Sequence, residues 1–275
     1  MSRILSVLAF TLAAALAVLP AAPAAFADTL DDVRARGTLR VGVSAFVPWT
    51  FESRSGALEG FEIDVGQRLA QDIGVEAAFV LVPFEEIIPR LHAGEFDMIA
   101  AGMAITPARA LEINFSRPYF ESGVTIATNT AATAEIERLA DLNAPGVSVA
   151  AVTDTLAAAL APRLFGEASL TLFADSEAAR ASVLAGESMV YIASVPEAKF
   201  FTLKHADAVD LPLPEPMVRS VAGFGVRKGE HDWLAFLNAW IEARTADLWL
   251  TSAHGHWFES LDWADRVDDG GGAAE

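Results

Sequence analysis

Short apolar runs alternate with amphipathic stretches along the first half of the chain. Apolar runs at residues 38–43, 75–82 and 96–100 have the length and composition of buried strands. Between them, residues 61–74 carry an apolar side chain at every fourth position and end at a glycine, which predicts a helix. A second helix is predicted over 83–94. Strands that alternate with helices in this order are typical of an α/β fold with a mostly parallel sheet.

The same alternation returns in the second half. Strands are predicted at residues 147–152, 169–173 and 189–193, and helices at 156–164 and 176–184. The pattern therefore indicates a second group of strands and helices rather than one extended sheet.

The C-terminal part has a different pattern. Residues 221–226 read as a strand, and residues 231–250 as a long helix whose tryptophans, phenylalanines and leucines recur at helical spacing. Aromatic side chains at such spacing are core residues far more often than ligand contacts. Residues 265–275 are acidic and glycine-rich, which predicts a disordered tail.

Residues 1–27 have the features of a secretory signal peptide. Arg3 precedes an apolar run over 4–19, and a small-residue motif places the cleavage site after Ala27. An uncleaved membrane anchor is the alternative, but the run is short for a bilayer-spanning helix. We therefore expect a periplasmic protein.

Composition narrows the functional classes. The chain has 19 basic and 37 acidic residues, and removal of Arg3 with the signal leaves 18 basic residues and a net charge of −19. Such an acidic surface argues against a nucleic acid as partner. The chain has no cysteine, which excludes thiol catalysis and cysteine metal sites. No hydrolase, zinc-protease or nucleotide-binding motif is present, so we expect no enzymatic activity, no cofactor and no metal.

The stretch over residues 101–109 is the strongest candidate binding element. It follows a predicted buried strand, and its small residues leave the amides of Gly102 and Ala104 accessible to a ligand. Thr106 is a suitable helix N-cap, and Arg109 lies in the first turn of the helix that follows. A guanidinium beside bare amides at the end of a strand suits a carboxylate. The alternative is an ordinary surface arginine.

A second polar cluster follows the strand at residues 147–152. Thr153, Asp154 and Thr155 precede the predicted helix, and its free amides can bind an anion or a polar ligand. The alternative interpretation is helix capping alone, for which all three residues are suited.

Three aromatic residues lie in the loop after the first strand. We assign Phe46 and Trp49 to a ligand cleft and Phe51 to the core.

Five motifs occur in order along the chain: Gly60-Phe61-Glu62-Ile63-Asp64-Val65, Phe84 through Pro89, Gly94-Glu95-Phe96-Asp97-Met98-Ile99, Gly102 through Arg109, and Phe115-Ser116-Arg117-Pro118-Tyr119. The series resembles the family 3 extracellular solute-binding proteins, which serve polar amino acid ABC transporters.

The resemblance implies a two-lobed periplasmic-binding-protein-like fold of type II. Two mixed, mostly parallel sheets would be joined by two crossing strands, with the ligand in the cleft between the lobes. Residues 28–124 and 221–264 would form the first lobe and residues 125–220 the second. The partners implied are a small solute and a membrane ABC permease, and the protein would act as a monomer.

The resemblance also assigns ligand contacts. Arg109 and the amides of Gly102 and Ala104 would hold the α-carboxylate of an amino acid. Phe46 and Phe84 would lie around its side chain.

Two departures from the family pattern concern the ligand's amino group. Family members carry an aspartate near Ser44 and another at the position of Ser194, where it binds the α-ammonium. A buried ammonium without a carboxylate is costly. Either Asp154 or Glu121 replaces that aspartate, or the ligand has no ammonium. A binding protein for a non-amino carboxylate and an enzyme like cyclohexadienyl dehydratase are therefore the alternatives, and the enzyme would need Asp154 or Glu121 as its acid or base.

Overall fold

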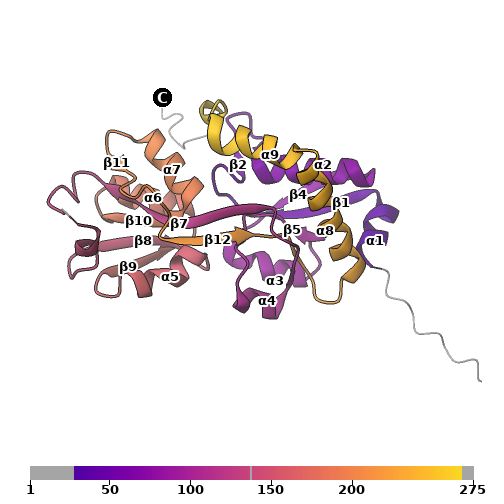
Figure 1. Ribbon diagram of the computed structural model, residues 1–275, viewed down its shortest axis with the longest axis horizontal. Coiled ribbons are helices and arrows are strands. Elements are labelled where there is room, and N and C mark those ends of the chain that lie inside the picture. Colours follow the sequence, from indigo (N-terminus) through magenta and orange to yellow (C-terminus); the bar gives the residue numbers. More distant parts are fainter. Residues whose placement is uncertain (1–27, 137, 268–275) are drawn as a thin grey trace, which may run out of the picture.

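The computed structural model describes residues 28–136 and 138–267, which form two α/β lobes (Figure 1). The predicted signal peptide and residues 268–275 lie outside the described residues. The two-lobed α/β fold is confirmed. None of the helices among the described residues has both the length and the apolar character needed to cross a bilayer.

The first lobe is built on a five-stranded sheet with the order β4-β1-β5-β13-β6. β1 lies parallel to both β4 and β5, whereas β13 is antiparallel to β5 and β6. Parallel neighbours are expected from the strand–helix–strand pattern. The strands are β1 (Thr38–Val43), β4 (Glu76–Leu81), β5 (Met98–Ile99), β6 (Asn114–Phe115) and β13 (Gly225–Val226).

Helices and one hairpin complete this lobe. The helices are α1 (Thr29–Arg36), α2 (Phe61–Ile73), α3 (Ile87–His92), α4 (Pro107–Glu112), α8 (His231–Ala246) and α9 (Trp249–His254), with short turns of helix at Phe84–Glu86, Gly255–Ser260 and Ala264–Arg266. The hairpin pairs β2 (Phe51–Glu52) with β3 (Leu58–Glu59). The predicted helices at 61–74 and 83–94 are thereby confirmed.

The second lobe contains a six-stranded sheet with the order β11-β7-β10-β8-β9, and β12 also pairs with β7. Its strands are β7 (Phe120–Asn129), β8 (Ser148–Val152), β9 (Ser169–Phe173), β10 (Val190–Ser194), β11 (Val209–Asp210) and β12 (Val218–Ala222). Its helices are α5 (Leu156–Leu164), α6 (Ser176–Leu184) and α7 (Val195–Lys204), with one helical turn at Leu139–Leu142.

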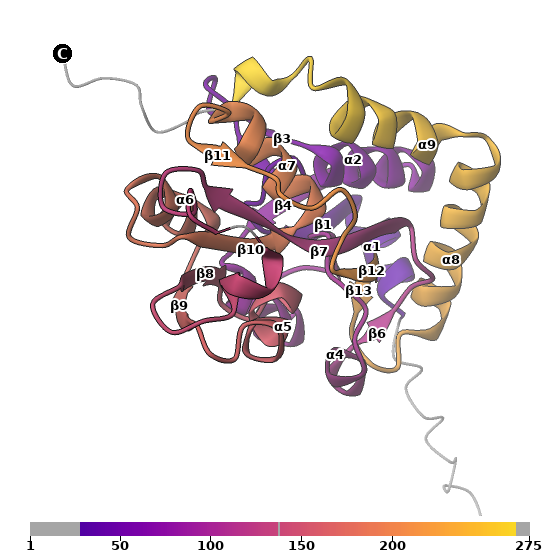
Figure 2. The same cartoon turned by 60° about the vertical axis from the view of Figure 1, so that its left-hand side comes forward.

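Two antiparallel strands connect the lobes. β7 and β12 run side by side from Val124 opposite Val218 to Phe120 opposite Ala222, and Figures 1 and 2 show both ribbons passing between the lobes. The predicted strand at 221–226 is in fact two strands, because the chain leaves β7 after Ala222 and enters the first sheet at Gly225. The exact lobe boundaries stay a prediction, since both strands belong to the connection.

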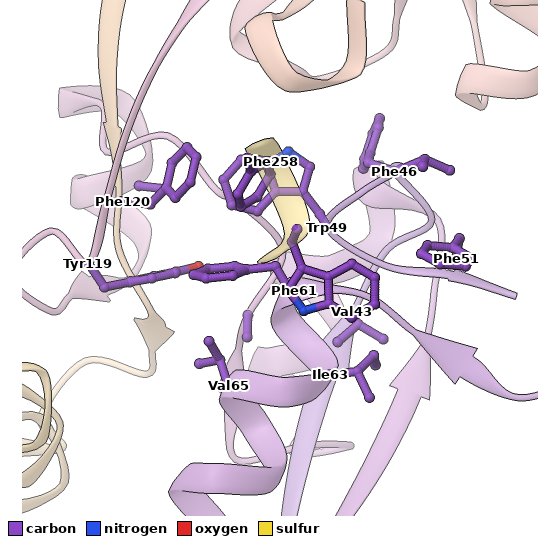
Figure 3. Packing of buried hydrophobic residues seen from close by; sticks show 14 of the residues in the cluster. Val43, Phe46, Trp49, Phe51, Phe61, Ile63, Val65, Tyr119, Phe120 and Phe258 are labelled. Carbon is purple, nitrogen blue, oxygen red and sulfur yellow. The ribbon is translucent and has the colours of Figure 1, made fainter. Parts of the chain in front are cut away.

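An aromatic cluster packs the first lobe where the connecting strands enter it (Figure 3). Trp49 lies in the middle, with ring centroids 5.8 Å from Phe61, 4.4 Å from Phe120 and 4.9 Å from Phe258. All four side chains are buried. The cluster thus joins a loop, a helix, a connecting strand and the C-terminal segment.

Three segments differ from the sequence prediction. α7 was not predicted, because its apolar pattern is weak and a proline, Pro196, lies two residues after the end of β10. Proline is nevertheless well tolerated in the first turn of a helix. The long C-terminal helix is broken, since Leu248 adopts a left-handed conformation with a φ of 65°. The predicted disordered tail begins too early, because Val267 is buried and pairs with Ser53.

Gly60 positions the start of α2 under the aromatic cluster. Its φ is 131°, and a Cβ at this position would lie 2.4 Å from the carbonyl oxygen of Trp49. We expect Gly60→Ala to lower the free energy of unfolding by at least about 2 kcal/mol, because both the backbone and the contact would be strained. Thermal unfolding measures this loss.

The matched control is Gly74→Ala at the other end of α2. Gly74 also has a positive φ, of 83°, but nothing lies within 4 Å of the place that an alanine methyl group would take. We expect this variant to lose about 1 kcal/mol. Equal losses in both variants would contradict the role given to the contact with Trp49.

Candidate functional site

A cavity of about 70 Å³ lies between the two lobes. The first lobe contributes Phe46, Trp49, Phe84, Gly102, Ala104 and Arg109, which are all the first-lobe residues predicted to contact a ligand. The second lobe contributes Thr155, Leu156, Tyr191, Ser194 and Glu197, and the connecting strands add Ser122 and Ser220.

Arg109 reaches from the first lobe to the second. Thr106 caps α4 by accepting a hydrogen bond from the Arg109 amide, and this cap fixes the start of the helix. The guanidinium donates from Nη1 to the carbonyl of Ala104 at 2.9 Å and from Nη2 to the carbonyl of Asp154 at 2.6 Å. Burial lowers the pKa of Arg109, while the Asp154 carboxylate opposes this effect. An arginine remains charged under such a shift, so the cavity contains a fixed cation.

The two amides expected beside Arg109 are not equivalent. The Gly102 amide donates to Glu62 Oε1 at 2.6 Å, so the expectation that it is free for a ligand is wrong in this conformation. The Ala104 amide donates to no other described residue, although its carbonyl accepts from Arg109. Ala104 therefore keeps the backbone donor that the sequence suggested.

Glu62 lies behind Gly102, fully buried in the first turn of α2. Its Oε1 also accepts a hydrogen bond from the Tyr119 hydroxyl at 2.6 Å, whereas Oε2 has no hydrogen-bond partner among the described residues. Burial raises the pKa of Glu62 to about 7, although both donors lower it. Glu62 thus holds the Gly102 turn in place from inside the lobe.

Aromatic rings form one side of the cavity. Phe46 and Phe84 meet edge to face with their ring centroids 5.4 Å apart. The Arg109 guanidinium carbon lies 5.3 Å from the centroid of the Phe84 ring. This contact orients the guanidinium, and it leaves apolar surface for a ligand side chain. Phe51 packs against Trp257 and Trp263 instead, as expected of a core residue.

The capping segment before α5 contributes differently from the prediction. Thr155 caps the helix by accepting from the Ala158 amide, and it lines the cavity. Thr153 donates instead to the carbonyl of Phe173, and neither it nor Asp154 is among the lining residues. Asp154 has a φ of 59° and contributes its carbonyl to Arg109. Asp154 therefore contacts Arg109 through its backbone carbonyl.

Ser44 and Ser194, at the two positions where family members carry aspartates, lie in different surroundings. Ser44 is buried, and its hydroxyl donates to the Val82 carbonyl at 2.9 Å, so it is a core residue. Ser194 lines the cavity at the end of β10, and its side chain caps nothing. Glu121, one of the suggested substitutes, lies outside the lining of this cavity.

Glu197 is the site residue that the sequence analysis missed. It lies in the first turn of α7, is 4% exposed and lines the cavity. The Tyr191 hydroxyl donates to its Oε1, and none of the ion pairs between described residues includes it. Burial raises the pKa of Glu197 to about 7, while Tyr191 and the charge of Arg180 lower it. The missed signal was an acidic residue one turn after a strand end, in a helix that the sequence did not predict.

The cavity therefore combines a cation from one lobe with a buried carboxyl group from the other. Such a pair can bind a small molecule that carries a carboxylate at one end and a polar or cationic group at the other. Among the described residues, no group of three or more histidine and acidic side chains is arranged to hold a metal ion. His254 packs against Phe120 and Phe258.

Comparison with known proteins places this geometry in a family. Residues 39–260 match the model of the bacterial extracellular solute-binding proteins, family 3. A probable amino-acid ABC transporter periplasmic-binding protein of Sinorhizobium fredii is 30% identical over 267 residues, which cover 91% of this chain and 88% of that protein.

Two further comparisons concern a related enzyme. The crystal structure of an ancestral amino acid-binding protein, described as a precursor of cyclohexadienyl dehydratase, superposes with a TM-score of 0.77 at 32% identity. The match covers 85% of this chain and all of that one. Cyclohexadienyl dehydratase of Pseudomonas aeruginosa is 28% identical over 120 residues, which cover 43% of this chain and 45% of the enzyme.

The family match spans most of the chain, and the ancestral structure has the same fold over its whole length. The series of motifs found in the sequence is thus explained by common descent. The chain belongs to the bacterial extracellular solute-binding proteins, family 3.

Proposed function

We propose that this protein is exported to the periplasm, binds a small carboxylate-bearing solute between its lobes and delivers it to a membrane ABC permease. The observation that carries the proposal is the Arg109 guanidinium, which lines the cavity at the boundary between the lobes. The relative from Sinorhizobium fredii is named as a binding protein of an amino-acid ABC transporter. An amino acid or a close relative is the solute class that suits both findings.

Binding would be coupled to closure about the connecting strands. In the present conformation Arg109 donates to the carbonyl of Asp154 across the lobe boundary, and such a contact exists only when the lobes are close. A carboxylate bound to Arg109 would touch both lobes and stabilise the closed state relative to the open one. The permease would then recognise the closed, loaded protein. We propose that the protein acts in this cycle as a monomer without a cofactor.

A ligand panel tests this proposal. The purified mature protein is heated alone and with each of the twenty common L-amino acids, and with the 2-keto acids derived from them, at 1 mM. A ligand with a Kd near 10 µM should stabilise the protein by about 2.7 kcal/mol and raise its melting temperature by several degrees. If no compound in either set shifts the transition, the proposed solute class is wrong.

An enzyme on the same scaffold is the second candidate function. One specific observation favours it: Glu197 is a buried carboxyl group with its pKa raised to about 7, and it faces the cavity. A group with such a pKa can donate a proton near neutral pH. Glu197 would then have the role for which Asp154 or Glu121 was considered from the sequence. Turnover of prephenate or arogenate by the purified protein would support this function, and binding without turnover would support the solute-binding function.

A further inference from the structure

The second-lobe side of the cavity contains oxygen atoms that form no ion pair with another described residue, although the charge of Arg180 acts on Glu197 from a distance. Glu197 is held at one oxygen by the Tyr191 hydroxyl, and none of the ion pairs between described residues includes it. Ser122, on the connecting strand β7, has a buried hydroxyl with no hydrogen-bond partner in the described part of the chain, and it lines the same cavity. Ser194 adds a third side-chain oxygen at the end of β10. Buried polar atoms of this kind normally have partners.

We propose that Glu197, with the hydroxyl groups of Ser122 and Ser194, receives a positively charged amino group of the bound solute. This inference rests on the proposed solute-binding function and makes its ligand an amino acid rather than a deaminated carboxylate.

The chemistry of an ammonium group matches this set of atoms. An ammonium group has three N–H donors and no acceptor, and Glu197 and the two serines offer a carboxylate oxygen and two hydroxyl oxygens. With Tyr191 donating to Oε1, Oε2 of Glu197 is the oxygen left for the ligand. Arg109 comes from the other lobe, so an amino acid would place one charge on each lobe and neutralise both.

The positions of the other acidic side chains support the choice of Glu197. Glu121 does not line this cavity, and Asp154 contacts Arg109 through its backbone carbonyl. The Ser44 side chain is buried in the core, where its hydroxyl donates a hydrogen bond to the Val82 carbonyl. Among the described residues that line the cavity, Glu197 is the only one with a carboxyl group in its side chain.

The experiment compares matched pairs of ligands on matched variants. Affinities of each L-amino acid that shifts the melting temperature, and of the 2-keto acid with the same side chain, are measured by calorimetry on the wild-type protein and on Glu197→Gln. We expect the amino acids to bind the wild type at least 30-fold more tightly than their keto analogues. Glu197→Gln should weaken the amino acids at least 30-fold and leave the keto acids within threefold.

Further variants separate recognition from folding. Glu121→Gln alters a carboxylate outside the cavity, and it should change neither the affinity for the amino acids nor the affinity for the keto acids. Ser122→Ala removes one acceptor without touching Glu197 and should weaken the amino acids alone, by about five- to tenfold. This variant decides the matter if Glu197→Gln fails to fold.

The outcomes distinguish this inference from the function on which it rests. Keto acids that bind as tightly as amino acids, or variants that weaken both sets equally, would overturn the role of Glu197 while leaving carboxylate binding intact. Turnover of prephenate or arogenate that is lost in Glu197→Gln would overturn it too, in favour of a proton donor. Absence of binding in both sets would contradict the proposed function itself.

Discussion

Replacing Arg109 with alanine is expected to weaken solute binding at least about 100-fold, or about 2.7 kcal/mol. The guanidinium lies in the cavity and can offer two parallel N–H donors to a carboxylate, and truncation of one partner of such a buried charged pair typically costs 2–5 kcal/mol. The measurement is calorimetric titration with the amino acid from the panel that binds the wild-type protein most tightly.

Two other arginine substitutions make this result specific. Arg109→Lys keeps the charge but loses the planar fork, so we expect an intermediate loss of about tenfold. Arg219→Ala removes an exposed arginine of the connecting strand β12 that lies outside this cavity, and it should leave the affinity unchanged. If Arg109→Ala binds the solute as tightly as the wild type, Arg109 does not hold the carboxylate.

The second large effect concerns the pH dependence of stability through Glu62. Its folded pKa is raised from 4.5 to about 7, so the folded protein holds a proton that the unfolded chain releases at lower pH. Stability is therefore lost as the pH rises from about 4.5 to about 7. Between pH 5 and pH 8 this residue alone is expected to lower the free energy of unfolding by about 2 kcal/mol.

Glu62→Gln isolates this contribution. Glutamine keeps an oxygen that can accept from Gly102 and Tyr119, but it has no charge to bury. The variant should gain stability relative to the wild type as the pH rises from 5 to 8, by about 4–8 °C in melting temperature. Glu112→Gln, at the exposed end of α4, should leave the pH profile unchanged. A constant difference between Glu62→Gln and the wild type across this range would contradict this account, because it would show that Glu62 has the same pKa in the folded and unfolded states.

The fold could be predicted from the sequence because its signals are local. The fourfold apolar spacing of α2 and the apolar runs of β1 and β4 each fix an element with its buried face. α7 could not be predicted in the same way. α7 is buried by its contacts with β7 and β10. β7 is distant from α7 in the sequence, and β10 directly precedes it.

The candidate site shows the same division. Arg109 and the aromatic wall could be found because they follow strand ends, where ligands bind in α/β folds. The hydrogen bond from the Gly102 amide to Glu62 could not be predicted, because the two residues come together only when α2 packs beside the loop after β5. Glu197 is a similar case. Its position in the cavity depends on a helix that the sequence pattern does not reveal.

The central claim is that the Arg109 guanidinium binds the carboxylate of a solute held between the lobes. A crystal structure of the protein with the amino acid that binds most tightly tests it most directly. The account predicts a carboxylate oxygen within about 3.2 Å of the Arg109 guanidinium, in the cavity formed by both lobes. A ligand bound elsewhere, or one bound in the cavity with its carboxylate away from Arg109, would contradict it.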